Sequence, residues 1–216
     1  MPFGVEHTTS GHNFAIFSKH ATAVTLLLYF NRQRKPDHEI FLDPKLNRTG
    51  DVWHILIQNL PGCFFYMYRM EGPQQLELGY IFDHRQLLLD PYVKFIAGLE
   101  DWGKRESEPN QLLGYFKTDC YDWGNDQEPN IPLSDTIIYE MHVRGFSQHP
   151  SSGVINSGTY RGIIEKIAYL KSLGITAIEL MPVQEFDETD CRYVNPQTGA
   201  KLLNYWGYST IGFFAL

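Results

Sequence analysis

The hydrophobic pattern of the chain changes near residue 135, and this change constrains the fold more than any other feature of the sequence. Before it, short runs rich in β-branched and aromatic residues are separated by turns that contain Gly, Pro, Asn and Asp. The runs are residues 12–18, 24–30, 39–42, 52–57 and 64–70. Short strands at this spacing predict an all-β sandwich of the immunoglobulin-like class. Trp53, Tyr66 and Tyr68 alternate along these strands, and we expect them in its core.

A different order of elements follows residue 135. Residues 136–143 form an apolar run typical of a buried strand, and residues 175–183 form a second one. Between them, Thr159 is a candidate N-cap and Gly174 a candidate helix stop. The apolar residues at helical spacing between cap and stop are Ile163, Ile164, Ile167, Leu170 and Leu173. Strand, helix and strand in this order predict a βαβ unit of a parallel sheet with a right-handed crossover.

The segment between the two regions, from about residue 96 to 134, is rich in Gly, Pro, Asn and Asp and has no sustained period. It therefore predicts a long connector. A single βαβ unit cannot cover both faces of its sheet. The apolar stretch at residues 211–216 carries no stop signal, whereas chain termini are usually polar and exposed. We therefore expect the second domain to be incomplete.

Composition and charge exclude several classes of function. The formal net charge of −7 argues against a nucleic-acid partner, because a phosphate backbone needs a basic surface. No apolar run is long enough to span a membrane, and the N-terminal residues do not resemble a signal peptide. Cys63, Cys120 and Cys191 lack metal-ligand spacing, which favours reduced thiols and a cytoplasmic location.

Metal and cofactor motifs are not found in the sequence. His7, His12, His20 and His142 have no partners at metal-ligand spacing, and we expect them to be hydrogen-bonded or exposed. No Gly-x-Gly-x-x-Gly motif follows a strand, so the βαβ unit is not predicted to bind a dinucleotide. We therefore predict no metal and no cofactor.

Six segments, in order along the chain, resemble isoamylase-type and glycogen debranching enzymes of the α-amylase superfamily. Residues 138–146 read Ile-Tyr-Glu-Met-His-Val-Arg-Gly-Phe, similar to the first barrel strand of that superfamily. Residues 173–183 are similar to the end of the first helix and the second strand, and residues 204–209 to the loop that follows. The segments that resemble the N-terminal module of these enzymes are residues 13–18, 50–54 and 87–94.

The resemblance implies an architecture and an activity. It implies a family 48 carbohydrate-binding type of β-sandwich at residues 1–97, a connector at 98–134, and strands one and two of a truncated (β/α)₈ barrel at 135–216. Such a barrel hydrolyses the α-1,6 branch linkages of glycogen or starch-type glucans by a retaining mechanism with two carboxylates about 5 Å apart. The resemblance implies that the catalytic groups lie on the fourth, fifth and seventh strands of the barrel, so we expect no catalytic residue in this chain.

The resemblance assigns substrate contacts to the 204–209 segment. In the matching motif the second Tyr, here Tyr208, stacks under the sugar ring that is cleaved. We therefore predict Tyr208 as a substrate-binding residue, together with Trp206, although Trp206 also suits a packing role. Modules of the N-terminal type bind glycogen through tryptophans in two loops. Here those loops, residues 31–36 and 72–76, contain no aromatic residue.

Other carboxylates are interpreted as structural or solvated. Asp83 ends a run that superficially resembles the family's nucleophile strand, but Ile81 replaces the expected Arg and the run lies in the sandwich. We expect Glu140, in mid-strand, to be partly buried and paired. The remaining carboxylates follow the second strand, where a solvated loop is expected: Glu185, Asp187 and Glu188.

Two alternatives to a hydrolase fragment stay open on the sequence alone. The chain could be a stand-alone glucan-binding or interaction protein without catalysis. It could also be a scaffold that docks to a full-length partner through an unpaired strand edge.

Overall fold

The computed structural model describes residues 2–33, 35–99, 102–104, 112–118 and 121–216 of the chain. They form two compact units, neither of them continuous in sequence. The first unit contains residues 1–120, 184–204 and 209–216, and the second contains residues 121–183 and 205–208. The predicted domains, with boundaries at residues 97 and 134, are continuous in sequence, unlike these two units. These boundaries stay a prediction.

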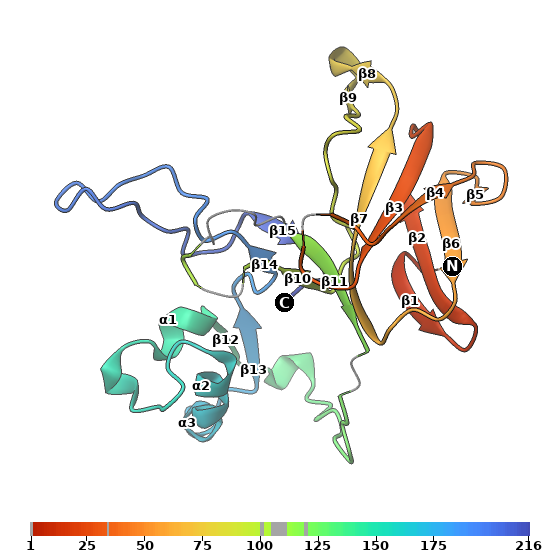
Figure 1. The fold of residues 1–216 in the computed structure, drawn as a ribbon. Helices are drawn as coiled ribbons and strands as arrows, with labels where there is room; N and C mark the ends of the chain where they lie inside the picture. Colours follow the sequence, from red (N-terminus) through yellow and green to blue (C-terminus); the bar gives the residue numbers. More distant parts are fainter. Residues whose placement is uncertain (1, 34, 100–101, 105–111, 119–120) are drawn as a thin grey trace. The chain divides into compact units, whose positions relative to one another are not determined.

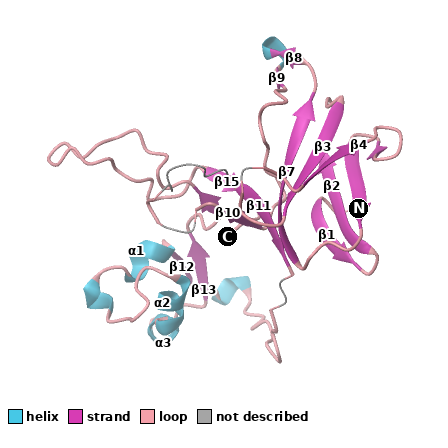
Figure 2. Ribbon diagram, in the orientation of Figure 1, coloured by secondary structure: helices cyan, strands magenta, loops and turns pink. Residues whose placement is uncertain are grey.

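The first unit is built around two antiparallel sheets (Figures 1 and 2). The four-stranded sheet has the order β1-β2-β6-β5, and the five-stranded sheet has the order β10-β11-β7-β3-β4. The strands of the first sheet are β1 (Gly4–Thr8), β2 (Gly11–Phe17), β5 (Arg48–Thr49) and β6 (Val52–Ile57). Those of the second are β3 (Ala23–Tyr29), β4 (His38–Leu42), β7 (Cys63–Glu71), β10 (Phe95–Ala97) and β11 (Leu113–Lys117). The predicted β-sandwich is confirmed.

The core of the sandwich comes from side chains of both sheets. Trp53, Tyr66 and Tyr68 are buried in one cluster with Phe14 and Leu26, which confirms their predicted core positions. On each strand the inward residues alternate with outward ones, as a two-residue period requires. A smaller cluster covers the outer side of β3 and β7 and contains Leu27, Tyr29, Met67 and Leu113.

His12 corrects the expectation that the histidines are hydrogen-bonded or exposed. It is buried, and within the described part of the chain neither of its ring nitrogens has a hydrogen-bond partner. Its ring meets Phe64 and Phe116 edge-on, with centroids 5.2 and 4.9 Å away. Burial, followed by the charge of His7, lowers the pKa of His12. A neutral imidazole therefore fills an aromatic position in the core.

Strand β11 corrects the connector prediction. Its residues Leu113–Lys117 lie inside the predicted connector, yet they pair antiparallel with β7, with Gly114 opposite Tyr66. A Cβ atom at Gly114 would lie 3.0 Å from the Tyr66 carbonyl oxygen, so glycine allows the close approach. Glycine interrupts the apolar alternation that identifies a strand, which explains the missed prediction. The connector residues 100–101, 105–111 and 119–120, Cys120 among them, lie outside the described residues.

One 3₁₀ turn and two small strand pairs also belong to the described part of the first unit. Strands β8 (Gln74–Gln75) and β9 (Tyr80–Ile81) pair around the 3₁₀ turn η1 (Leu76–Leu78). Strands β14 (Glu185–Phe186) and β15 (Thr210–Gly212) pair antiparallel with a shifted register. The aromatic ring of Tyr92 stacks on that of Phe214, with centroids 5.2 Å apart, which ties the last residues to this unit.

The second unit contains the predicted βαβ arrangement. Strands β12 (Ile138–Met141) and β13 (Ala177–Leu180) pair in parallel, and Met141, Ile163 and Leu170 form a buried cluster beside them. The helices between them are α1 (Val143–Ser147), α2 (Tyr160–Glu165) and α3 (Ile167–Ser172). The 3₁₀ turns are η2 (Leu133–Asp135) and η3 (Pro150–Ser152). Within the described residues, no helix is long and apolar enough to cross a membrane.

The crossover helix is divided, whereas the apolar spacing predicted one continuous helix. Lys166, with φ −100° and ψ 2°, ends α2 and precedes α3. Gly174 has a φ of +80°, which is the left-handed conformation that a helix stop favours and confirms that prediction. The spacing identifies the helical face but carries no signal for a single non-helical residue within it.

Thr159 is the N-cap of α2, as predicted, and its replacement by Ala should destabilise the second unit by about 1 kcal/mol. Its hydroxyl oxygen accepts a hydrogen bond from the Gly162 amide at 3.2 Å, which the variant would lose. Hydrogen exchange of the α2 amides measures the change directly. Thr159→Ser keeps the hydroxyl and is the control. Equal exchange rates in both variants would contradict the capping role.

Candidate functional site: the aromatic loop after the first parallel strand pair

The predicted substrate-binding residues lie on a short loop at residues 204–209. The Asn204 side-chain amide donates to the Ser209 hydroxyl at 2.7 Å and closes the base of this loop. Gly207 is buried and has a φ of +76°, a conformation that side chains rarely adopt. Trp206 is 52% exposed and Tyr208 is 73% exposed. The loop therefore presents two aromatic side chains to solvent on a tightly turned backbone.

His142 follows β12 directly and contacts this loop. Its Nδ1 atom accepts a hydrogen bond from the Gly145 amide at 3.1 Å and caps α1. Nδ1 therefore carries no proton, so in the neutral ring Nε2 carries it. Nε2 lies 2.9 Å from the Tyr205 carbonyl oxygen, which can only accept, so His142 donates to it. One imidazole thus joins the start of α1 to a loop 63 residues later.

The aromatic rings around His142 pack in two orientations. The rings of His142 and Tyr205 stack, with centroids 4.4 Å apart and an interplanar angle of 14°. The Trp206 ring stands edge-on to both, at 5.7 Å from His142 and 5.4 Å from Tyr205. Trp206 therefore has a packing contact as well as an exposed face, and Tyr208 has the more exposed side chain of the two.

Glu140 differs from its prediction. It is exposed rather than partly buried. Of the residues of β12, only Met141 is buried. The two-stranded sheet leaves the other side chains of β12 uncovered. In the parallel register Glu140 lies opposite Glu179, so the pair adds negative charge to this sheet.

Asp187 and Glu188 also differ from their prediction as parts of a solvated loop. Both are buried in the first unit. An Asp187 carboxylate oxygen accepts from the Thr189 amide at 2.8 Å and from its hydroxyl at 2.6 Å. The Glu188 carbonyl accepts from the Asn204 amide at 2.7 Å, and Glu185 is half-buried in the β14–β15 pair. The turn at Asp187 and the β14–β15 pair cover this segment. Its polar sequence alone does not predict that it is buried.

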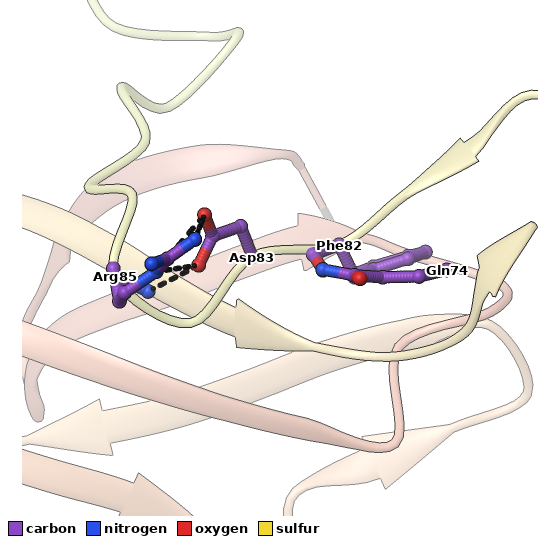
Figure 3. A network of polar contacts seen from close by, with 4 residues as sticks. All are labelled: Gln74, Phe82, Asp83 and Arg85. Atoms are coloured by element: carbon purple, nitrogen blue, oxygen red, sulfur yellow. Dashed lines mark hydrogen bonds and ion pairs between the residues drawn. The ribbon is translucent and has the colours of Figure 1, made fainter. Parts of the chain in front are cut away.

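The Asp83 side chain holds its own loop together through hydrogen bonds with Arg85 (Figure 3). Its carboxylate accepts from the Arg85 side chain at 2.8 and 2.9 Å and from the Arg85 amide at 3.0 Å. These bonds lower the pKa of Asp83 to about 2. The neighbouring Phe82 carbonyl accepts from the Gln74 side chain at 2.7 Å, which joins the loop to β8. This geometry agrees with a structural role in the sandwich.

An apolar depression of about 430 Å³ lies between α2, α3 and β13 in the second unit. Its lining is mostly Ile and Leu side chains, which offer few partners for the hydroxyl groups of a sugar. Among the described residues, no three His, Cys, Asp or Glu side chains gather closely enough to hold a metal ion. Cys63 and Cys191 are free thiols.

Comparisons with known proteins match the two parts of the chain to two families. Residues 2–93 match carbohydrate-binding module 48, the isoamylase N-terminal domain. Residues 105–206 match the catalytic domain of α-amylase. The chain belongs to the isoamylase type of the α-amylase superfamily. This isoamylase-type chain has an N-terminal module followed by the start of a catalytic domain, as the sequence predicted.

Curated relatives of this isoamylase-type chain match it over its whole length. The chloroplastic isoamylase 3 of Oryza sativa subsp. japonica is 42% identical over 228 residues, which is 100% of this chain and 29% of the relative. The glycogen debranching enzyme of Salmonella typhi is 34% identical over 230 residues, 100% of this chain and 34% of the relative. The chain therefore spans 29% and 34% of the lengths of these two relatives.

Solved structures share the fold of the chain. A pullulanase from Bacillus acidopullulyticus aligns with a TM-score of 0.73 and 24% identity, over 99% of this chain and 25% of that protein. A pullulanase from Paenibacillus barengoltzii in complex with maltotriose aligns with a TM-score of 0.71 and 21% identity, over 99% of this chain and 32% of that protein.

Sequence reasoning missed the role of His142. The sequence predicted only that this residue is hydrogen-bonded or exposed. The two hydrogen bonds of His142 confirm that prediction, but the sequence did not identify their partners. No spacing rule joins residues 63 positions apart, so the sequence held no signal for the contact with Tyr205.

Proposed function

We propose that this chain is the N-terminal part of a glycoside hydrolase that cleaves α-1,6 branch linkages of glycogen or starch-type glucans. In the complete enzyme the mechanism is retaining, and the two carboxylates come from strands outside this chain. The names of the relatives, isoamylase and glycogen debranching enzyme, support this activity. The observation that carries the proposal is the exposed Tyr208 ring on a loop held beside the end of β12.

The position of the loop suits a glucan contact. Active sites of (β/α)₈ barrels form at the C-terminal ends of the strands, and His142 is the first residue after β12. An aromatic face suits the C–H groups of a pyranose ring and the positive charge that develops on it during cleavage. In this proposal Tyr208 contacts the sugar that is cleaved, and Trp206 adds a partly exposed side chain on the same loop.

The proposed partner is a branched α-glucan such as glycogen or amylopectin. The net charge of −7 supports a neutral partner over nucleic acid. The free thiols Cys63 and Cys191 agree with the cytoplasmic location that we propose, while the plant relatives are chloroplastic by name.

Release of reducing ends from amylopectin tests the proposed activity. The complete protein should release them, and the 216-residue chain alone should not. Tyr208→Ala in the complete protein should reduce kcat/KM about tenfold, because an aromatic–cation interaction contributes about 1–2 kcal/mol. Tyr169, an exposed tyrosine on α3, provides the matched control Tyr169→Ala, which should have no effect. A complete protein without activity on amylopectin would refute the proposal.

A native gel containing glycogen distinguishes a stand-alone glucan-binding protein from a fragment of a hydrolase. We expect the mobility of the 216-residue chain to be the same with and without glycogen, because Trp53, Tyr66 and Tyr68 are buried and unavailable to a sugar. The loop at residues 72–76 contains no aromatic residue. Retardation by glycogen would favour the binding protein over the hydrolase fragment.

A further inference from the structure

We propose that His142 is the positioning residue for the aromatic loop, defined here as residues 205–208. Its imidazole fixes the backbone of this loop, and with it the placement of Trp206 and Tyr208. The inference rests on the proposed function only where it concerns the sugar that Tyr208 contacts. The contacts that carry it lie within the second unit.

The two nitrogens of His142 have separate tasks. Nδ1 accepts from the Gly145 amide at 3.1 Å, and Nε2 donates to the Tyr205 carbonyl at 2.9 Å. The first bond fixes the ring against α1 and determines which nitrogen carries the proton. The second transfers that fixed orientation to the loop. A residue that accepts at one end and donates at the other, with a rigid plane between them, suits a positioning role.

Packing limits the loop from two further sides. The Tyr205 ring lies flat on the His142 ring at 4.4 Å. Beyond it, a Cβ atom at Gly145 would lie 2.7 Å from the Tyr205 hydroxyl oxygen, closer than real Cβ atoms approach. The missing side chain at Gly145 therefore makes room for Tyr205. Trp206 completes the arrangement, with its ring perpendicular to the His142 and Tyr205 rings.

This anchor precedes a left-handed turn in the loop. Gly207, with a φ of +76°, separates Trp206 from Tyr208 in a conformation that side chains rarely adopt. A functional side chain on a loop needs supporting contacts that hold the loop in a defined geometry. The bond from His142 to the Tyr205 carbonyl is such a contact, three residues before Tyr208.

The spectroscopic test uses the 216-residue chain labelled with 5-fluorotryptophan. Its ¹⁹F spectrum should contain four tryptophan resonances, and Trp206→Phe assigns one of them to Trp206. His142→Asn keeps an N-cap acceptor for α1 but is too short to bridge to the Tyr205 carbonyl. We expect it to shift or broaden the Trp206 resonance and to leave those of Trp53, Trp102 and Trp123 in place.

Two further variants keep this test decisive. Gly145→Ala retains His142 and favours the helix, but it displaces Tyr205, so it should also move the Trp206 resonance. His149 caps η3 by accepting from the Ser151 amide at 3.2 Å, so His149→Asn is a matched control that should change nothing at Trp206. An unmoved Trp206 resonance in both His142→Asn and Gly145→Ala would overturn the inference.

Kinetics of the complete protein provide the second readout. If His142 acts through the loop, His142→Asn should lower kcat/KM on a branched glucan about tenfold or more. In a Tyr208→Ala background it should cost little further, because the two changes remove the same contact. Fully additive losses would contradict the positioning role. A wild-type protein without activity would refute the proposed function alone, since the ¹⁹F result does not depend on catalysis.

Discussion

Replacement of Asp90 by Asn is expected to raise the free energy of unfolding of the sandwich at pH 8 by about 2–3 kcal/mol and to change it little at pH 3. Asp90 is only 1% exposed. Its carboxylate accepts from the Tyr66 hydroxyl at 3.1 Å and from the Tyr92 amide at 2.9 Å. Burial outweighs these bonds and raises the pKa of Asp90 to about 6 from its usual 3.8.

The direction of this pH dependence follows from proton binding. Between about pH 4 and pH 6 the folded chain holds a proton on Asp90 and the unfolded chain does not. Stability from this group is therefore complete at acid pH, falls as the pH rises towards 6, and stays low above it. A shift of about two units corresponds to about 3 kcal/mol. Asn keeps an oxygen for the Tyr92 amide and never ionises, so the variant lacks this loss.

The measurement is urea unfolding at several pH values, with the difference between variant and wild type as the result. The difference removes the contribution of His12, whose lowered pKa gives stability that is lost as the pH falls below about 6.5. Glu6 is exposed on β1, so Glu6→Gln is a matched carboxylate-to-amide control. A pH-independent difference between Asp90→Asn and wild type would show that burial of the carboxylate is not responsible.

Replacement of Trp53 by Ala should destabilise the first unit by about 3–5 kcal/mol, a large part of the total stability of a small domain. The side chain is fully buried between the sheets, and its indole nitrogen donates to the Ser18 carbonyl at 3.2 Å. The Arg48 guanidinium lies 5.0 Å from the ring centroid. The variant would leave a large cavity and an acceptor without its donor.

Urea unfolding followed by far-UV circular dichroism measures this loss without relying on the fluorescence of Trp53. Trp123 is 69% exposed, and Trp123→Ala should change the free energy of unfolding by less than about 0.5 kcal/mol. If both variants lost the same stability, Trp53 would not be the central core residue of the sandwich.

The periodicity of the sequence was sufficient to predict most of the architecture. Two-residue alternation identified the main sandwich strands, and helical spacing with Thr159 and Gly174 identified the crossover of the βαβ unit. The division of the crossover at Lys166 and the strand at Leu113–Lys117 escaped it. In both cases a local exception, one non-helical residue or one glycine, carries no periodic signal.

The site was less predictable than the fold. The family resemblance predicts Tyr208 and Trp206 as substrate contacts, and both side chains are exposed on one loop. The residue that holds the loop, His142, could not be found because its contacts are distant in sequence. The burial of Asp187 and Glu188 was missed for a similar reason, since it depends on pairing between β14 and β15.

The most direct test of the central claim is the ¹H NMR spectrum of a branched glucan during incubation with the complete protein. Anomeric protons of α-1,6 and α-1,4 linkages give separate signals, so the bond that is cleaved can be read without a coupled assay. We predict that the α-1,6 signal disappears while the α-1,4 signal is retained, and that the 216-residue chain alone changes neither. Loss of the α-1,4 signal with the α-1,6 signal intact would contradict the assignment as a debranching hydrolase.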